Sequence, residues 1–232
     1  MRVPRPLLIV VAAAALAVVA ACAAPPAPDR LDPSQFVVTV AAEMRTAGLG
    51  DDPTPVTYIL VDVENRAGRD AHVTLTGALL GDAPAPGQAR PELVGLTPEE
   101  LYVPAGAVRT YALVDAERRA RPEARGAEVR IRTAIAARHR PEMVVTDVRL
   151  HEDPVEVPGG RAARAVVGAS LTNEATRPGT VIVFAAFRDA HGRPLARPYD
   201  VVGIGAGVTR ALRFVGPPGS VDGTVYIGDV TY

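Results

Sequence analysis

Side chains that could carry covalent or acid–base chemistry are few in this chain. Its 232 residues include one cysteine, three serines and four histidines. All 25 basic residues are arginine, which excludes a Schiff-base lysine, a P-loop lysine and a lysine general base. Each remaining candidate must therefore be judged by the residues around it.

Cys22 stands at the end of an N-terminal hydrophobic segment. Residues 1–21 combine a basic start, Arg2 and Arg5, with an uncharged apolar run over 7–21. That run is shorter than the roughly 20 residues that a membrane-spanning helix needs, and is typical of a signal peptide. The segment Val19-Ala20-Ala21-Cys22 resembles the bacterial lipobox, in which an aliphatic residue and two small residues precede an obligatory cysteine. The resemblance implies cleavage between Ala21 and Cys22, and a diacylglycerol group on the Cys22 thiol.

A buried or disulfide-bonded cysteine after an ordinary signal peptide is the alternative. With one cysteine in the chain, an intramolecular disulfide is impossible. Two or three acyl chains on Cys22 and its freed amine, such as palmitate, would anchor the protein stably, which one chain does not. We therefore predict that Cys22 is a membrane anchor and not a nucleophile, redox partner or metal ligand.

Residues 22–34 are predicted to be the lipidated cysteine and a tether. Four prolines among residues 23–34 disfavour both helix and central strand. Because Ala23 follows the cysteine in place of aspartate, the resemblance favours the outer membrane in a host with two membranes. The expected location is the cell envelope, outside the cytoplasm.

From residue 36 onward the sequence predicts an all-β fold. Short apolar or alternating runs are interrupted by Gly, Pro, Asn or Asp about every eight to twelve residues. Helical signals are limited to Thr97–Leu101, where Thr97 could cap and Pro98 could start a helix, and to the arginine-rich segment 116–125. The predicted strands are Phe36–Thr46, Val56–Glu64, Ala71–Leu80, Val108–Val114, Glu128–Ala136, Met143–His151, Ala163–Thr172, Thr180–Arg188, Val208–Val215 and Gly223–Tyr232.

The folded part also repeats itself weakly. VTYILVDVEN ends at Asn65 and ARAVVGASLTN ends at Asn173, and each is followed eight residues later by a valine. Two copies of a module of roughly 100 residues account for this similarity. We predict a first β-sandwich over 35–137, a linker at 138–142 and a second β-sandwich over 143–232.

The residues that carry a family resemblance lie in the second copy: Val166 to Gly168, Asn173, Phe184, Phe187, Asp189, Gly192 and Gly207. On these residues it resembles the FxLYD-type immunoglobulin-like domains of bacterial envelope proteins, although Arg188 stands where the tyrosine of that name would be. The Asn turn and the Phe-x-Asp-x-x-Gly pattern also resemble the YcfL-like small envelope lipoproteins. The resemblance covers the second half, and it implies an extracytoplasmic binding or scaffolding module without catalytic residues. Together with the repeat, it leads us to expect two tandem immunoglobulin-like β-sandwiches after a helical signal peptide and the proline-rich tether.

Within that copy, the strand over 180–188 is apolar at both alternating sets of positions. This pattern predicts a central strand covered by an opposing sheet. Asp189-Ala190-His191-Gly192 and Asn173 are predicted to form turns.

The other polar clusters are interpreted as turns and surface loops, without a metal or cofactor. The four histidines show no metal-ligand spacing. His151-Glu152-Asp153 precedes a Pro-Gly-Gly turn, so an exposed hairpin tip is favoured over a metal site. Asp51-Asp52 likewise predicts a turn, with weak Ca²⁺ binding as the alternative.

Three further patterns are also assigned no site. Gly219-Ser220-Val221-Asp222-Gly223 has a glycine-flanked serine but no strand–turn–helix context for a nucleophile. The glycine-rich segment 203–207 lacks the helix that would bind a phosphate. The basic cluster 117–125, and Arg138 with Arg140, are interpreted as solvated loops, with contact to phosphate headgroups or an acidic partner as the alternative.

The net charge of −1 argues against a nucleic-acid partner. The leading hypothesis is a non-enzymatic, membrane-anchored lipoprotein that acts as a binding or scaffold module for an envelope protein or polymer. The alternative is a ligand-binding lipoprotein that holds a small molecule, an ion or a polymer between the two domains. A pocket with converging polar groups near residues 137–142 would favour that alternative, whereas a filled junction would favour the scaffold. An enzyme would need a His–acid pair buried in a cleft.

Overall fold

The all-β prediction is confirmed by a computed structural model of the chain, which describes residues 29–41, 44–49 and 52–232. One turn of 3-10 helix, η1 (Pro33–Gln35), follows Asp32, whose side chain accepts a hydrogen bond from the Ser34 backbone N–H. Within the described ranges, no helix is long and apolar enough to cross a membrane. The expected signal peptide, its cleavage site at Ala21 and Cys22, and tether residues 22–28 lie outside the described residues.

The first sandwich is built from β1 (Phe36–Val40), β2 (Arg45–Leu49), β3 (Asp52–Asn65), β4 (Ala71–Leu80), β5 (Glu92–Val103), β6 (Val108–Val114) and β7 (Gly126–Ala136). In one sheet, β3 pairs with β6 along one edge and with β1 and β2 along the other. In the second sheet, β4 lies between β5 and β7. All these pairings are antiparallel. Each sheet packs one face against the core that the two sheets share.

The second sandwich repeats this plan with β8 (Met143–Val157), β9 (Gly160–Asn173), β10 (Gly179–Arg188), β11 (Pro194–Ala196), β12 (Tyr199–Ile204), β13 (Thr209–Val215) and β14 (Asp222–Thr231). One sheet has β9 between β8 and β13. The other has β10 between β14 and the pair β11 and β12. The strands β9, β10, β13 and β14 therefore occupy the places of β3, β4, β6 and β7.

The internal repeat extends to single side chains. Asn65 at the end of β3 and Asn173 at the end of β9 are both fully buried. The Asn65 amide donates a hydrogen bond to the Val103 carbonyl of β5, at 2.8 Å, and the Asn173 amide donates to the Ile204 carbonyl of β12, at 3.3 Å. Each amide oxygen also accepts a backbone N–H from two residues further on. Asn173 forms the predicted turn and Asn65 forms an equivalent one, and each asparagine also ties one sheet of its sandwich to the other.

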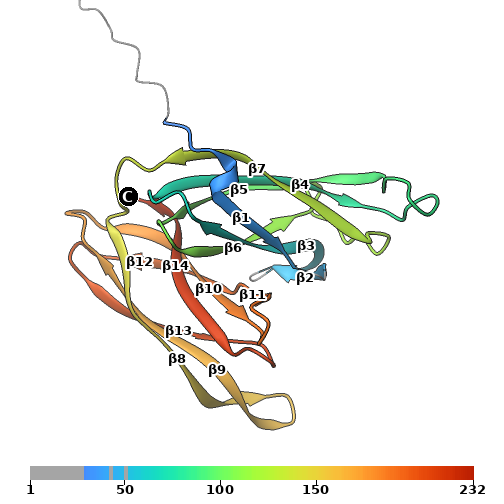
Figure 1. Ribbon diagram of the computed structural model, residues 1–232. Helices are drawn as coiled ribbons and strands as arrows, with labels where there is room; N and C mark the ends of the chain where they lie inside the picture. Colours follow the sequence, from blue (N-terminus) through green and yellow to red (C-terminus); the bar gives the residue numbers. More distant parts are fainter. Residues whose placement is uncertain (1–28, 42–43, 50–51) are drawn as a thin grey trace, which may run out of the picture.

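The two faces of β10 enter two different cores. Val183 and Phe187 pack in the core of the second sandwich, whereas Phe184 and Ala186 join the core of the first, together with Tyr226 of β14. Figure 1 shows the sheet of β10 and β14 lying against the sheet of β3 and β6. The expected central strand with two apolar faces is confirmed, but its outward face is covered by the other sandwich.

The helix expected at Thr97–Leu101 is wrong, because these residues belong to β5. The register with β4 shifts here, since Leu75 pairs with Glu99 while Gly77 pairs with Leu96. Thr97 and Pro98 thus oppose a single residue of β4, as in a β-bulge. A bulge on an edge strand tolerates proline, which has no N–H to give to the ladder.

The helix expected at 116–125 is also wrong, because this segment is an irregular connection between β6 and β7. Arg118 has a φ of 53°. The Arg121 backbone N–H donates to the Thr57 hydroxyl at 2.7 Å, and its Nε donates to the buried Asp115 carboxylate at 2.7 Å. The basic cluster is therefore partly structural, since it fixes the crossing from one sheet to the other.

Other differences concern strand boundaries. The strand expected over 36–46 is divided into β1 and β2, because Val40 pairs with Val61 while Arg45 pairs with Tyr58. The segment between them has two more residues than the opposing part of β3 and cannot stay in register. β5, β11 and β12 were not expected as strands, and β8 and β9 extend further than expected.

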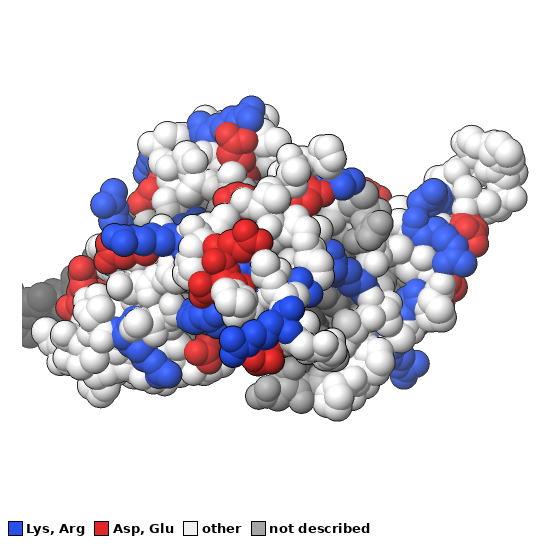
Figure 2. Space-filling model, turned by 90° about the horizontal axis from the view of Figure 1, so that it is seen from below, with Lys and Arg blue, Asp and Glu red and all other residues white. Residues whose placement is uncertain are grey.

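Charges of both signs are mixed over the surface. Figure 2 shows arginines and carboxylates interspersed on one face, without a continuous region of one sign. Exposed ion pairs of the molecule include Arg66–Glu64 and Arg161–Glu156. The mixed charges of the face in Figure 2 provide no broad positive field for a polyanion there.

Candidate binding site between the sandwiches

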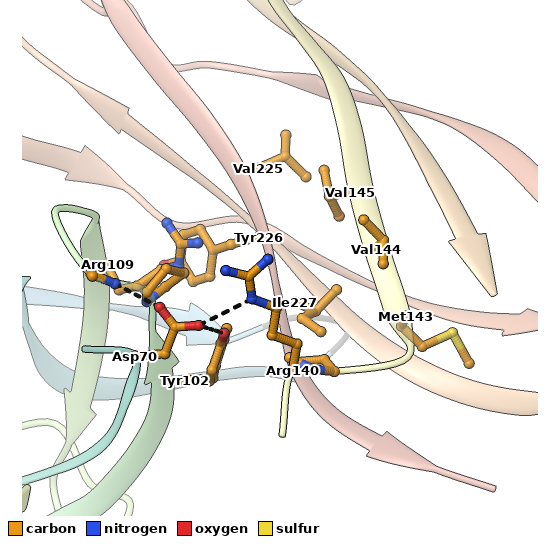
Figure 3. Close-up of a pocket in the computed structure, with 13 residues that line it drawn as sticks. Asp70, Tyr102, Arg109, Arg140, Met143, Val144, Val145, Val225, Tyr226 and Ile227 are labelled. Atoms are coloured by element: carbon orange, nitrogen blue, oxygen red, sulfur yellow. Dashed lines mark hydrogen bonds and ion pairs between the residues drawn. The ribbon is translucent and has the colours of Figure 1, made fainter. Parts of the chain in front are cut away.

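A pocket of about 470 Å³ lies at the junction of the two sandwiches. This volume is within the roughly 300–1,000 Å³ range of small-molecule sites. Its walls come from the ends of β4, β5 and β6, from the linker, and from β8 and β14 (Figure 3). The polar lining residues include Asp70, Tyr102, Arg109, Arg140 and Tyr226.

Asp70 organises one polar wall. Its carboxylate accepts hydrogen bonds from the Tyr102 hydroxyl, at 2.5 Å, and from the Ala105 backbone N–H, at 3.0 Å, and lies 3.4 Å from Nε of Arg140. The hydrogen bond from Tyr102, followed by that from Ala105, lowers the pKa of Asp70. Burial and the hydrogen bond to Asp70 raise the pKa of Tyr102 to about 12. At neutral pH this wall therefore holds a carboxylate and a protonated phenol.

Arg109 forms a second polar wall. Its guanidinium carbon lies 4.9 Å from the centre of the Tyr226 ring, and Nη1 donates to the Val108 carbonyl at 3.0 Å. Nε is buried and has no hydrogen-bond partner. Burial lowers the pKa of Arg109. Tyr226 and Tyr102 oppose this shift, and the positive charge of Arg188 adds to it. The residue as a whole is partly exposed, and within the described residues its guanidinium has no carboxylate partner, so Arg109 is a cation without a counter-ion in this pocket.

Aliphatic side chains form the facing wall. Figure 3 shows Val144 and Val145 of β8 and Val225 of β14 on the side of the pocket opposite Arg109, with Ile227 beside Arg140. The pocket is therefore amphipathic, with cations on one side and branched apolar groups on the other.

A buried network holds the two halves of the pocket together. The Arg188 guanidinium of β10 donates to both carboxylate oxygens of Asp62 on β3, at 2.8 and 3.2 Å, and to the Thr110 hydroxyl at 3.0 Å. The Thr110 hydroxyl in turn donates to Asp62. The Tyr226 hydroxyl donates to the Thr110 carbonyl. These contacts fix the Tyr226 ring under Arg109.

A second ion pair crosses the same interface. Arg197, between β11 and β12, donates to the Glu99 carboxylate of β5 at 2.7 Å and to the Thr110 carbonyl at 3.2 Å. Its guanidinium carbon lies 4.1 Å from the centre of the Phe184 ring. Burial raises the pKa of Glu99, while Arg197 opposes that shift. The two ion pairs, together with the apolar contacts of Phe184, make the junction a packed interface.

Apart from Arg140, the clusters singled out in the sequence do not contribute to this pocket. His151 and Asp153 lie 3.1 Å apart, but in exposed positions within β8 and not at the hairpin tip as expected. The Ser220 hydroxyl donates to the Pro217 carbonyl in a turn. The turn at Asp189 is confirmed, because its carboxylate accepts the backbone N–H groups of His191 and Arg193.

Metal ligands do not gather in the described residues. Across residues 29–41, 44–49 and 52–232, no group of three or more His, Cys, Asp or Glu side chains is placed to hold a metal ion. Asp51, the first residue of the pair weighed for Ca²⁺, lies outside the described residues.

Sequence reasoning interpreted Arg140 as part of a solvated loop, with anionic contact only as the alternative, and missed Asp70, Tyr102 and Arg109. These residues belong to separate segments, and no local motif links them. Arg109 does follow the pair Ala105-Gly106, which Ala206-Gly207 repeats in the second copy. That repeated pair indicates a turn and not a site. Only the packing of the two sandwiches brings the pocket residues together.

No protein-family model matches the chain, and no curated protein matches it. One similar solved structure is the crystal structure of red sea bream transglutaminase, with 17% sequence identity and a TM-score of 0.26. The match covers 78% of this chain and 27% of that chain, so the chain spans about a quarter of the transglutaminase length. A likeness this weak assigns neither a family nor an activity.

Proposed function

We propose that the protein is a non-enzymatic lipoprotein, anchored in the envelope through Cys22, that binds a small ligand between its two sandwiches. The observation that carries this proposal is the pocket beside the linker, where Asp70, Arg109 and Arg140 converge. A filled junction would have favoured the scaffold hypothesis. The pocket instead favours ligand binding.

The surroundings of the histidines support a role other than catalysis. His151 pairs with Asp153 and His72 lies near Glu100, and in both pairs the side chains are substantially exposed. General acid–base catalysis needs an imidazole positioned against a substrate in a site with restricted water. The described histidines lack such a setting.

The test begins with anchoring. In the native host, the full chain should fractionate with detergent-extractable membranes, and Cys22→Ser should remove that association. Undiminished membrane retention of the variant would contradict the anchor.

The pocket is tested by filling it. Val145→Phe, on the pocket wall, should reduce the amount of small molecule that copurifies with the membrane-extracted protein, measured by native mass spectrometry. Because Val145 also packs against the core of the second sandwich, an unchanged melting temperature must accompany that loss. Val148→Phe is the matched control, because Val148 lies on the same strand and is exposed. Equal ligand content in both variants and the parent would count against ligand binding at this junction.

A scaffold role is the second candidate, favoured by a projecting ribbon. β13 pairs with β9 from Val166 onward, so residues 160–165 of β9 have β8 as their partner in the ladder. Figure 1 shows this β8–β9 hairpin extending away from the rest of the sandwich. Two-stranded ribbons are marginally stable alone, so a partner protein could cover it. Crosslinked partners lost when residues 154–163 are replaced by a short turn would support this role.

A further inference from the structure

The pocket carries an excess of positive charge. Arg109 and Arg140 line it together with one carboxylate, Asp70. Asp70 already accepts two hydrogen bonds besides its contact with Arg140. In the described part of the chain, no ion pair is formed by Arg109, and its Nε has no hydrogen-bond partner. These features favour an anionic group beside Arg109, within reach of Arg140.

The opposite wall favours a ligand with an apolar part. Val144 and Val145 are partly exposed there, and Val225 and Ile227, which also pack in the core of the second sandwich, add apolar surface to the same wall. Burying aliphatic surface is favourable by about 25 cal/mol per Å². The complementary ligand therefore has an anionic head and an apolar part.

The position of the pocket relative to the tether indicates where such a ligand comes from. Asp29, the first described residue, pairs with Arg69 at 2.7 Å, and its carbonyl accepts the Ala136 backbone N–H at 2.9 Å. Ala137, which follows β7, donates its backbone N–H to the carbonyl of Asp70, which precedes β4, at 2.8 Å. The tether therefore enters the fold beside the Asp70 wall of the pocket.

The tether also limits the distance to the membrane. Asp29 is seven residues after Cys22, so the fully extended segment spans at most roughly 25 Å. A lipid-anchored chain would therefore keep this end of the molecule close to the bilayer surface.

We propose that the pocket binds an anionic amphiphile of the membrane, with its phosphate or carboxylate head at Arg109 and Arg140 and its hydrocarbon part along Val144, Val145, Val225 and Ile227. This inference rests on the proposed function, because it assigns the ligand class of the same pocket. In this proposal Arg109 recognises the anionic head of the ligand, a role that its hydrogen bond to the Val108 carbonyl does not explain.

The test uses the full-length, lipidated protein in nanodiscs of zwitterionic phosphatidylcholine. Binding is measured by isothermal titration with three probes: dodecyl phosphate, inorganic phosphate and the neutral dodecyl maltoside. Dodecyl phosphate should bind at least tenfold more tightly than either of the others. Inorganic phosphate binding as tightly as dodecyl phosphate would show that a free anion is the ligand, and equal binding of the neutral probe would show apolar binding without charge recognition. Either result overturns the proposal.

The variants separate recognition from folding. Arg109→Met should weaken dodecyl phosphate binding about tenfold to a hundredfold, as expected for a lost charge-assisted hydrogen bond. Its melting temperature without ligand should stay close to that of the parent, because Arg109 is partly exposed and Met retains the apolar part of the side chain. Arg132→Gln, an exposed arginine of β7 away from the pocket, is the matched control and should bind normally. Unchanged dodecyl phosphate binding in Arg109→Met overturns the role assigned to Arg109. An equal loss of binding in Arg109→Met and in Arg132→Gln overturns it as well.

The failure of this inference can be distinguished from failure of the proposed function. If dodecyl phosphate does not bind, but Val145→Phe still removes a copurifying molecule, the pocket binds a ligand of another class and the amphiphile proposal is overturned. If dodecyl phosphate does not bind and Val145→Phe has no effect on ligand content, both proposals are overturned.

Discussion

Asp62 and Arg188 are 126 residues apart and form a buried bidentate ion pair between the two sandwiches. Both side chains are 9% exposed. The pair lies on the outward faces of β3 and β10, which would be in water if the sandwiches were separate. The contact therefore exists only in the packed arrangement that also forms the pocket.

Removing one partner of this pair should be strongly destabilising. Asp62→Ala leaves the Arg188 guanidinium buried without its carboxylate, and we expect a loss of about 3–5 kcal/mol in the free energy of unfolding. Urea denaturation followed by circular dichroism measures the change. The double variant Asp62→Leu/Arg188→Met should lose much less than the sum of the two single changes, because it leaves no unpaired charge. Additive single effects would contradict a direct pair.

The two asparagines of the chain predict a second, paired result. Asn65→Ala and Asn173→Ala each remove the amide that bonds the opposite sheet, and leave a buried carbonyl, Val103 or Ile204, without that partner. Each change should cost about 1–3 kcal/mol in the free energy of unfolding. Glu174→Ala, beside Asn173 but exposed, is the control and should change stability by less than about 0.5 kcal/mol. A loss at one asparagine without a comparable loss at the other would refute their equivalence.

These asparagines also show what could be predicted from the sequence. Their positions at the ends of two similar apolar runs indicated a repeat, and the strand pairings repeat in the same order. Hydrophobic patterning alone predicted most strands, because one face of each must be buried. The bond from each asparagine to the opposite sheet was not predicted, since its acceptor lies 38 or 31 residues away along the chain.

The failures have a common physical cause. Thr97 and Pro98 have the local features of a helix start, but pairing of β5 with β4 overrides five residues of helical propensity. Arg188 would be an exposed cation on an isolated sandwich, yet it is buried against Asp62. The pocket residues were missed for the same reason, because their proximity depends on tertiary packing across the domain junction.

Glycines on neighbouring strands provide a third prediction. A Cβ at Gly77 would lie 2.1 Å from the backbone oxygen of Glu128, whereas a Cβ at Gly95 would have its nearest neighbour at 4.0 Å. Gly77→Ala must move β7 away from β4, and should cost at least about 1–3 kcal/mol in the free energy of unfolding. Gly95→Ala should be neutral within about 0.5 kcal/mol or stabilising. Chemical denaturation of the two variants tests this, and similar values for both would argue against the close approach of β4 and β7.

The fourth prediction concerns acid stability and Asp70. Its pKa is lowered in the folded protein by hydrogen bonds from Tyr102 and the Ala105 backbone N–H. The unfolded chain therefore binds a proton more readily than the folded one, and stability falls as the pH drops below the ordinary carboxyl pKa of 3.8 through the lowered folded value. The stabilisation from the charged form is fully present well above that ordinary value, including at neutral pH.

Asp70→Asn should therefore differ most from the parent at neutral pH, and the difference should narrow as the pH falls below about 4. Urea unfolding from pH 7 to pH 3 measures both proteins. Tyr102→Phe keeps the carboxylate but removes its strongest hydrogen bond. The free energy of unfolding of this variant should therefore fall less between pH 7 and pH 3 than that of the parent, but should still fall. A constant difference between Asp70→Asn and the parent over the whole range would show that the charge of Asp70 does not contribute. A Tyr102→Phe profile parallel to the parent would show that the phenol does not hold the carboxylate in its charged form.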